Sequence, residues 1–438
     1  MRDIAFVVGL LAMLPFAIGR PHIGALLWCW TAMLVPNSLV YGFAISIHFN
    51  LIVVLFTLLL WVISKEPVRV PMNSTMVLLI IFGIFGTISA TFAIGPEGNA
   101  WNEWGKFSKI IFFALVVGSL FTNRTRIEAL IYAAFLSVGF HGVEEGVKFL
   151  ATGGSRHIYG PENSILYDNN HFALAILSLL PLVFFLYRQA KLPVLRMVLL
   201  GSAGVLFFTV IGTFSRGGLL GLLAIAVWAF IHSSRKIRYL AFAIPVALTL
   251  IAFAPERWTN RMDTISTADQ DESFMGRVIA WKQSTLIAFD NPILGGGFGA
   301  VQDFTIWTRY RLTKFHDLDF IPTDEPDPLA PHAAHSIYFQ VLGDLGFVGL
   351  ALFGALCLTA WRNTVIIVKK VKGHAELEWA QQLAQYAQYS LIAYVVSGAA
   401  LSMAYFEFMY ILFAIIASLR LIVERETHAP IPTVGSLR

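Results

Sequence analysis

Residues 75–95, TMVLLIIFGIFGTISATFAIG, decide the class of fold. This stretch contains no charged side chain, and a helix needs about 20 apolar residues to cross the hydrocarbon core of a bilayer. Similar runs recur at 4–19 and 51–64. Their apolar residues are continuous rather than alternating, which excludes the strands of a transmembrane barrel. We therefore expect an all-α, polytopic membrane protein.

The composition of the whole chain agrees with this expectation. Of its 438 residues, 57% are hydrophobic and 13% are charged, whereas ordinary soluble domains carry roughly twice that charged fraction. The net charge of +4 reflects lysines and arginines in short loops, so it does not indicate nucleic-acid binding. Cys29 and Cys357 both lie in apolar runs, so they provide neither a disulfide framework nor a metal site.

Apolar segments of near-spanning length occur along the whole chain. The candidate spans are 4–19, 23–41, 45–64, 75–95, 107–122, 127–141, 171–188, 195–213, 217–232, 239–254, 335–361, 386–402 and 405–423. The first two are short and are joined by GRPH, so we expect them to make one crossing. This gives about twelve transmembrane helices with both chain ends in the cytoplasm. No cleavage site of small residues follows the first run, so we expect it to be retained.

Short basic loops set the expected orientation. Those at 65–70, 123–126, 187–196 and 234–238 are separated by even numbers of spans, so they can all face the cytoplasm, as the positive-inside rule requires. The same parity places three segments outside: 142–170, 213–217 and 255–334.

Three regions follow from this topology. They are N-terminal transmembrane helices over 1–254, one large periplasmic loop over 255–334, and C-terminal transmembrane helices with a cytoplasmic tail over 335–438. The loop is interrupted by Pro and Gly, so we expect it to lack a large core and to lie on the membrane as a lid. Within it, WKQSTLIAF (281–289) has the composition of an interfacial helix, and GGGFG (295–299) indicates a tight turn.

Two arginines lie on the side predicted to be external. Arg216, in TFSRGGLLG, stands where one apolar run ends and the next begins, and Gly217 and Gly218 would leave its guanidinium open to a ligand. Arg277 lies in the external loop. Each also has a simpler interpretation, as a snorkelling side chain for Arg216 and as a solvated helix charge for Arg277. A guanidinium is nevertheless the preferred group for bidentate phosphate contact.

Two histidines, His332 and His335, directly precede an apolar run. Alone, they could be interfacial residues. With the two arginines on the same side, they form a set that fits a diphosphate leaving group and a base for a hydroxyl nucleophile, because an imidazole with a pKa of about 6.5 can accept a proton near neutral pH.

The motifs TFSRGG, GRVIAWKQS, NPILGGGFG and HSIYFQVLGDLGFVGL follow one another in this order over residues 213–350. In order and topology they resemble the O-antigen ligase and polymerase superfamily, over most of the chain. The resemblance implies a type C glycosyltransferase-like fold in the bacterial inner membrane with its active site on the periplasmic side. It also implies inverting transfer of glycan from undecaprenyl diphosphate to an acceptor, which is lipid A-core in the ligase branch, without a metal or other cofactor.

The same resemblance implies roles for individual residues. Arg216 and Arg277 would hold the diphosphate and His335 would be the base, although the family usually has Asn after this histidine and here Ser336 follows. The segment YDNNHFA (167–173) resembles an external, Asn-rich helix start of the family. The candidate substrate-binding residues beside the two arginines are therefore His332, Trp281, Tyr338, Asn170 and His171, with helix capping as the simpler interpretation of the last two.

Other functions remain open at this level. The acceptor could instead be a growing glycan or a protein, which would make the chain an O-antigen polymerase or a protein O-glycosylation ligase. A transporter of lipid-linked glycan is disfavoured, because the sequence contains no internal repeat and its candidate charges lie at one membrane face. The motif DLD (317–319) could bind a metal, yet it lies late in the chain among prolines, so a solvated acidic loop is the preferred interpretation. Zinc binding by His332 and His335 lacks a third ligand.

Overall fold

The computed structural model describes residues 1–96, 98–233, 236–237, 272–321, 323 and 331–428, and this part of the chain consists of helices and short connections with no strand. The α-helices are α1 (Arg2–Met13), α2 (Pro21–Leu34), α3 (Phe49–Ser64), α4 (Ser74–Thr91), α5 (Asn99–Leu120), α6 (Arg124–Ala134), α7 (Phe140–Ala151), α8 (Asn169–Gln189), α9 (Pro193–Gly212), α10 (Arg216–His232), α13 (Glu272–Asp290), α14 (Phe304–Thr313), α15 (Ile337–Lys370), α16 (Glu378–Ser397) and α17 (Glu407–His428). A π-helical segment, η4 (Phe135–Gly139), joins α6 to α7. The 3₁₀ turns are η1 (Leu14–Ala17), η2 (Pro36–Ser38), η3 (Phe43–Ser46), η6 (Ala300–Gln302), η7 (Phe315–Leu318), η8 (Ala375–Leu377) and η9 (Gly398–Ala400).

The prediction of an all-α membrane protein is confirmed for these residues. Five continuous helices are long and apolar enough to cross a membrane, namely α4, the α6–η4–α7 unit, α8, α9 and α15, and α3 and α10 are apolar but shorter. The candidate span at 239–254 lies outside the described residues. The total of twelve crossings therefore stays a prediction.

Local sequence explains where several helices begin. The side chains of Asn73, Asn123, Asp168 and Ser215 accept hydrogen bonds from backbone N–H groups in the first turns of α4, α6, α8 and α10, which satisfies donors that have no partner within the helix. Pro193 occupies the first turn of α9, where its missing N–H costs nothing.

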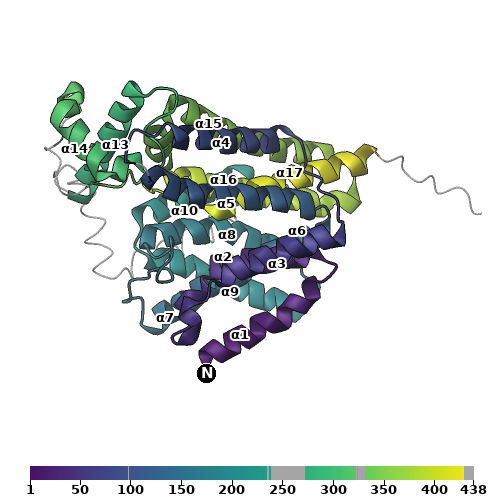
Figure 1. Cartoon of the computed structure of the whole chain (residues 1–438). Helices are drawn as coiled ribbons and strands as arrows, with labels where there is room; N and C mark the ends of the chain where they lie inside the picture. Colours follow the sequence, from purple (N-terminus) through teal and green to yellow (C-terminus); the bar gives the residue numbers. More distant parts are fainter. Residues whose placement is uncertain (97, 234–235, 238–271, 322, 324–330, 429–438) are drawn as a thin grey trace, which may run out of the picture.

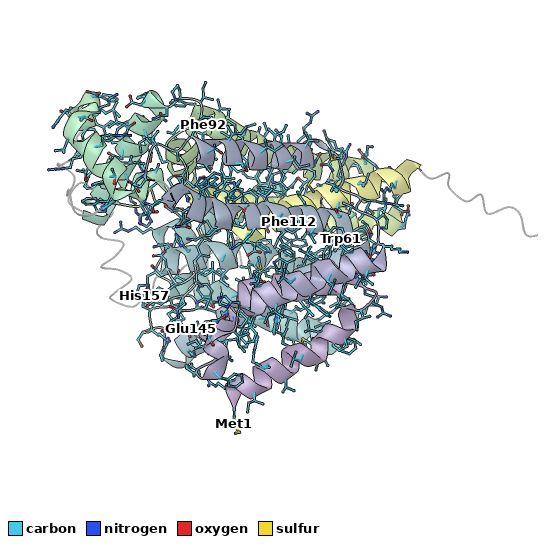
Figure 2. All side chains as sticks on the ribbon, in the orientation of Figure 1. Met1, Trp61, Phe92, Phe112, Glu145 and His157 are labelled. Atoms are coloured by element: carbon cyan, nitrogen blue, oxygen red, sulfur yellow. The ribbon has the colours of Figure 1, made fainter. Side chains whose placement is uncertain are left out.

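The helices lie roughly side by side, as Figure 1 shows, with α4, α5, α15, α16 and α17 together and with α2 and α3 packed as a pair beside them. α8 is the most enclosed of the five candidate spans and packs against α9, α10 and α16. α13 and α14 project at one end of the bundle (Figure 1). In Figure 2, Phe92 and His157 lie toward this end, and Trp61 lies toward the opposite end.

The opposite end joins three loops that the sequence places on one side. Arg126 pairs with Glu66, and Arg124 donates from Nη2 to Oε1 of Gln189 at 2.9 Å. The loops at 65–70, 123–126 and 187–196 are therefore neighbours. This arrangement agrees with the predicted common side, and the sidedness in the membrane remains a prediction.

The helix predicted at 127–141 is longer than expected. The α6–η4–α7 unit runs from Arg124 to Ala151, so this helix ends ten residues later than predicted. Its centre contains the π-helical segment, where the carbonyl of Leu136 accepts a hydrogen bond from Trp30 Nε1 at 3.2 Å. Extra residues in a helical turn leave carbonyls free for such partners. The apolar periodicity of the sequence does not reveal a π-helical segment.

Residues 281–289, interpreted as an interfacial helix, are more enclosed by protein than that interpretation implies. These residues belong to α13, which packs against α15 and α14, and Lys282, Gln283 and Ser284 are buried. One small apolar cluster, which includes Ala280, Leu286, Ile287, Val301 and Ile306, holds α13 to η6 and α14. The described part of the loop is thus a packed helical unit.

The GGGFG segment is a tight turn, as predicted, and it fits against a break in α15. Gly346 inside α15 has φ 68° and ψ −169°, and a side chain at Gly295 (φ 66°) would place its Cβ 2.4 Å from the Gly346 nitrogen. Gly297 N–H donates to the Asp344 carbonyl at 2.9 Å, and Phe347 N–H donates to the Pro292 carbonyl at 2.9 Å. The turn therefore takes over backbone hydrogen bonds at the break.

Candidate active site

His335 lies directly before Ser336, the N-cap of α15, at the end of the bundle that carries α13. Its φ of 42° is in the left-handed region, which few residues other than glycine adopt and which often marks a functional position. Its backbone N–H donates to Oγ of Ser402 at 2.7 Å. Its ring Nδ1 is buried and has no hydrogen-bond partner among the described residues, so the imidazole carries an unsatisfied polar atom.

Charged groups from distant segments surround this imidazole. Burial is the largest cause that lowers the pKa of His335 to about 4; the charges of Arg277, His171 and His332 lower it further, while Asp168 opposes the shift. The structure thus brings together α13, the start of α8 and the segment before α15. His335 is neutral over the physiological pH range, so its ring can accept a proton.

His332 and Arg277 lie on facing segments. The ring of His332 meets Trp307 edge-on with centroids 5.7 Å apart. A Cβ added to Gly276, the neighbour of Arg277, would lie 3.4 Å from His332 Nδ1. The sequence predictions for Arg277, His332 and His335 therefore converge in space.

Arg216 approaches the same region from another side. It is the first residue of α10, and the neighbouring Gly217 lies against the turn after α16, since a Cβ there would be 3.5 Å from both Ala400 Cβ and the Ser397 carbonyl. The same turn leads to Ser402, which holds the His335 backbone.

The glycines after Arg216 have a packing role. A Cβ at Gly218 would lie 2.9 Å from Ala173 Cβ, and one at Gly221 would lie 2.0 Å from Ser397 Oγ. They allow α10 to approach α8 and α16 closely. This close contact explains why Gly218 and Gly221 are glycines, and the predicted opening beside the Arg216 guanidinium stays a prediction.

At the start of α8, capping is performed by a residue that the sequence interpretation did not select. Asp168 Oδ1 accepts from the backbone N–H groups of Asn170 and His171 at 2.9 and 3.1 Å. The side chains of Asn170 and His171 are therefore not caps. Asn170 donates to Asn169 Oδ1 at 3.2 Å. His171 Nδ1 lies 2.9 Å from the Ile165 carbonyl, and its Nε2 is buried with no partner in the described part of the chain.

Trp281 and Tyr338 use their polar atoms inside the protein. Trp281 Nε1 donates to the Ala334 carbonyl at 2.6 Å, and its ring stacks on Phe339 with centroids 5.1 Å apart. The Tyr338 hydroxyl donates to the Val395 carbonyl at 2.8 Å. Both side chains fix the segment around His335, and their predicted contact with substrate stays a prediction.

The DLD motif has partners of its own. Asp319 accepts from Lys282 Nζ at 3.1 Å and contacts His316 Nδ1 at 3.1 Å; the hydrogen bonds from Lys282 and then His316 lower the pKa of the Asp319 carboxyl. Lys282 is almost fully buried and lies 4.0 Å from the centroid of the Phe315 ring. Across the described ranges, no group of three or more His, Cys, Asp or Glu residues could hold a metal ion.

Sequence reasoning missed Asp168 and Ser402. The first could have been found, because an acidic residue before a helix is a recognised N-cap signal. The second carries no local signal, since it contacts His335 from 67 residues further along the chain.

The chain matches two protein families. Residues 201–354 match the O-Antigen ligase family, and this match supports membership of the O-antigen ligase superfamily for the part of the chain that holds Arg216, Arg277 and His335. Residues 1–191, which hold Asn170 and His171, match a family of unknown function (DUF5935). No curated protein matches the chain. With the apolar helices, the first match indicates a membrane protein with a ligase or polymerase type of role in glycan transfer.

Proposed function

We propose that the protein transfers a glycan from undecaprenyl diphosphate to lipid A-core at the periplasmic face of the bacterial inner membrane. His335 would act as the base, and Arg216 and Arg277 would hold the diphosphate. The observation that carries the proposal is the convergence on His335 of Arg277, His332 and His171, in a chain whose residues 201–354 match the O-Antigen ligase family.

The reaction follows from the chemistry of these groups. A sugar hydroxyl of the acceptor attacks the anomeric carbon of the donor, its proton passes to the imidazole of His335, and the bond from the anomeric carbon to the diphosphate oxygen breaks. One direct displacement inverts the anomeric configuration. The leaving diphosphate gains negative charge, which fixed guanidinium groups stabilise. No nucleotide is needed, because the polyprenyl diphosphate donor is already activated.

The pKa of His335 connects donor binding to catalysis. Without donor, the charge of Arg277 helps to keep this pKa near 4, and the imidazole is then a weak base. A bound diphosphate would offset the charge of Arg277 and raise the pKa toward the range in which general bases work best. The base would therefore strengthen when donor is present.

The acceptor distinguishes the proposed ligase from two related enzymes. An O-antigen polymerase or a protein O-glycosylation ligase would use the same donor chemistry with a glycan or protein hydroxyl. A transfer assay with purified protein, lipid-linked glycan and lipid A-core tests the proposed acceptor directly. Transfer to a glycan or peptide but not to lipid A-core would identify the alternative, and movement of donor across a bilayer without transfer would identify a transporter.

The two arginines are tested by binding. Wild-type protein should prefer undecaprenyl diphosphate to undecaprenol, because the shared tail contributes equally to both. Arg216→Ala and Arg277→Ala should weaken that preference with undecaprenol binding unchanged, and Arg→Lys should also impair transfer because the planar fork is lost. Full preference in both alanine variants would show that the arginines are interfacial anchors.

A further inference from the structure

A polar cavity is formed by residues of the part of the chain that matches the family of unknown function. Its volume is about 360 Å³, which is within the range of ligand-binding pockets. We name it the tyrosine pocket and define it by six of its lining residues: Tyr159, Tyr167, Glu144, Glu145, Lys148 and Arg156. Figure 2 shows Glu145 of this pocket and the adjacent His157 at the same side of the molecule.

The charges in the tyrosine pocket neutralise one another. Lys148 Nζ lies 2.8 Å from Glu144 Oε1 and 2.7 Å from Glu145 Oε1, and Arg156 pairs with Glu145 at 3.1 Å. Arg2 and Glu162 also line the cavity, so the six charged side chains have a formal sum of zero. A phosphate site would present an excess of cations, whereas these paired groups offer acceptors and donors to neutral hydroxyls.

Two exposed aromatic rings form the other part of the lining. Tyr159 and Tyr167 are 44% and 50% exposed, and their rings are nearly parallel, with centroids 5.8 Å apart and an interplanar angle of 23°. The Tyr159 ring also lies against the His157 ring, with centroids 4.5 Å apart, so the exposed face of Tyr167 is the larger free stacking surface. An aromatic face carries partial negative charge, which attracts the slightly positive C–H groups on the apolar face of a sugar ring. Aromatic faces beside carboxylates therefore match both surfaces of a sugar.

The tyrosine pocket is connected to the elements of the candidate active site. His157, which also lines the cavity, contacts the Thr213 carbonyl through Nε2 at 3.0 Å, and Asn169 Nδ2 donates to the same carbonyl at 2.7 Å. Thr213 begins the TFSRGG motif. Tyr167 directly precedes Asp168, whose charge acts on His335. A sugar in this pocket would thus lie beside both segments that carry Arg216 and His171.

We infer that the tyrosine pocket is a carbohydrate subsite that takes a neutral sugar unit of a substrate glycan. The inference rests on the proposed function for the source of that glycan, which is either the lipid-linked donor or the acceptor. Its recognition chemistry, stacking plus hydroxyl contacts, is the same for both.

Binding can be measured without transfer. Full-length protein in nanodiscs is tested against an array of neutral bacterial oligosaccharides and against inorganic pyrophosphate. We expect at least one neutral oligosaccharide to bind, Tyr159→Ala and Tyr167→Ala to weaken it by about tenfold each through loss of a stacking surface, and the Tyr→Phe variants to retain it. Phe320→Ala, which removes an 80% exposed ring outside the pocket, is the matched control.

A charge variant keeps the inference falsifiable if the alanine variants do not fold. Glu145→Gln leaves Arg156 without this carboxylate and should weaken oligosaccharide binding while increasing pyrophosphate binding. Absence of neutral oligosaccharide binding to the wild type, or unchanged binding in Glu145→Gln, would overturn the inference.

The transfer assay separates the two sources of the glycan. A rise in the KM for a donor with several sugars, but not for a donor with one sugar, in Tyr159→Ala assigns the pocket to the donor, and a rise in the KM for the acceptor assigns it to the acceptor. Oligosaccharide binding by a wild type that transfers nothing would refute the proposed function and leave the subsite standing.

Discussion

Replacement of His335 by asparagine separates the chemistry of the imidazole from its unusual backbone. Asparagine is among the residues that most readily adopt a left-handed conformation, so His335→Asn keeps the φ of 42° and the N–H donation to Ser402. Only the base is lost. We expect transfer to fall by about 10²–10⁴-fold, the usual effect of removing a general base, or about 2.7–5.4 kcal/mol in the activation free energy.

The pKa of His335 adds a second measurement. Because this pKa is lowered from 6.5 to about 4 in the folded protein, the unfolded chain binds a proton first as the pH falls, and folding stability is lost between pH 6.5 and 4. From these two values, the wild type should lose about 2 kcal/mol of unfolding free energy by pH 5 through this group. His335→Asn should lack that loss.

The assays are initial transfer rates from pH 3.5 to 8 and thermal unfolding at pH 7 and pH 5, both in nanodiscs. The kcat/KM of the wild type should decline only near pH 4, because this parameter reports the pKa of the free enzyme. Wild-type rates in a folded His335→Asn protein would refute the assignment of the base. A decline of kcat/KM centred near pH 6.5 would refute the burial and charge argument.

Three further results are expected. Arg277→Gln should raise the pKa of His335, because one positive charge near it is removed, and move the acidic decline of kcat/KM to higher pH. An unmoved decline would show that the charge of Arg277 does not act on His335. Gly221→Ala should destabilise the protein by about 1–3 kcal/mol, because its Cβ would lie 2.0 Å from Ser397 Oγ. Adding Ser397→Gly should restore the thermal midpoint, and failure of this rescue would show that the clash lies elsewhere. Excess chelator should leave transfer unchanged; loss of transfer on chelation, with recovery in Mn²⁺ or Mg²⁺, would establish a metal site. Asp319→Asn should lower the thermal midpoint because it removes the partner of buried Lys282, whereas Asp317→Asn should leave the midpoint unchanged.

Hydrophobic runs were sufficient to predict most of the helices. The run at 75–95 corresponds to α4, and the run at 171–188 corresponds to α8, since length and apolarity are local properties. The composition of residues 281–289 was not sufficient to predict how deeply this helix is buried. Lys282 resembles an exposed charge in the sequence, and only the fold places it against Asp319 and the Phe315 ring. Such a contact depends on tertiary structure.

In the candidate site, too, the sequence predicts features that depend on local pattern and misses contacts that depend on the fold. Charge type and position before an apolar run selected Arg277, His332 and His335, which the structure brings together. Ser402 could not be selected, because a serine hydroxyl has no distinctive pattern and its partner is distant in sequence. Trp281 was selected for its chemistry, yet its N–H is used by the Ala334 carbonyl, and only the fold reveals that use.

The glycine turn and the break in α15 have a consequence for the exchange of parts between related chains. Gly295 and Gly346 exclude side chains from each other, and the backbone bonds at Gly297 and Phe347 cross the junction in both directions. An insertion on either side would put donors and acceptors out of register. The glycine turn and the break at Gly346 should therefore be exchanged together. A chimera that receives both keeps the backbone hydrogen bonds between them, whereas a chimera that receives only the loop loses the matching half of these contacts.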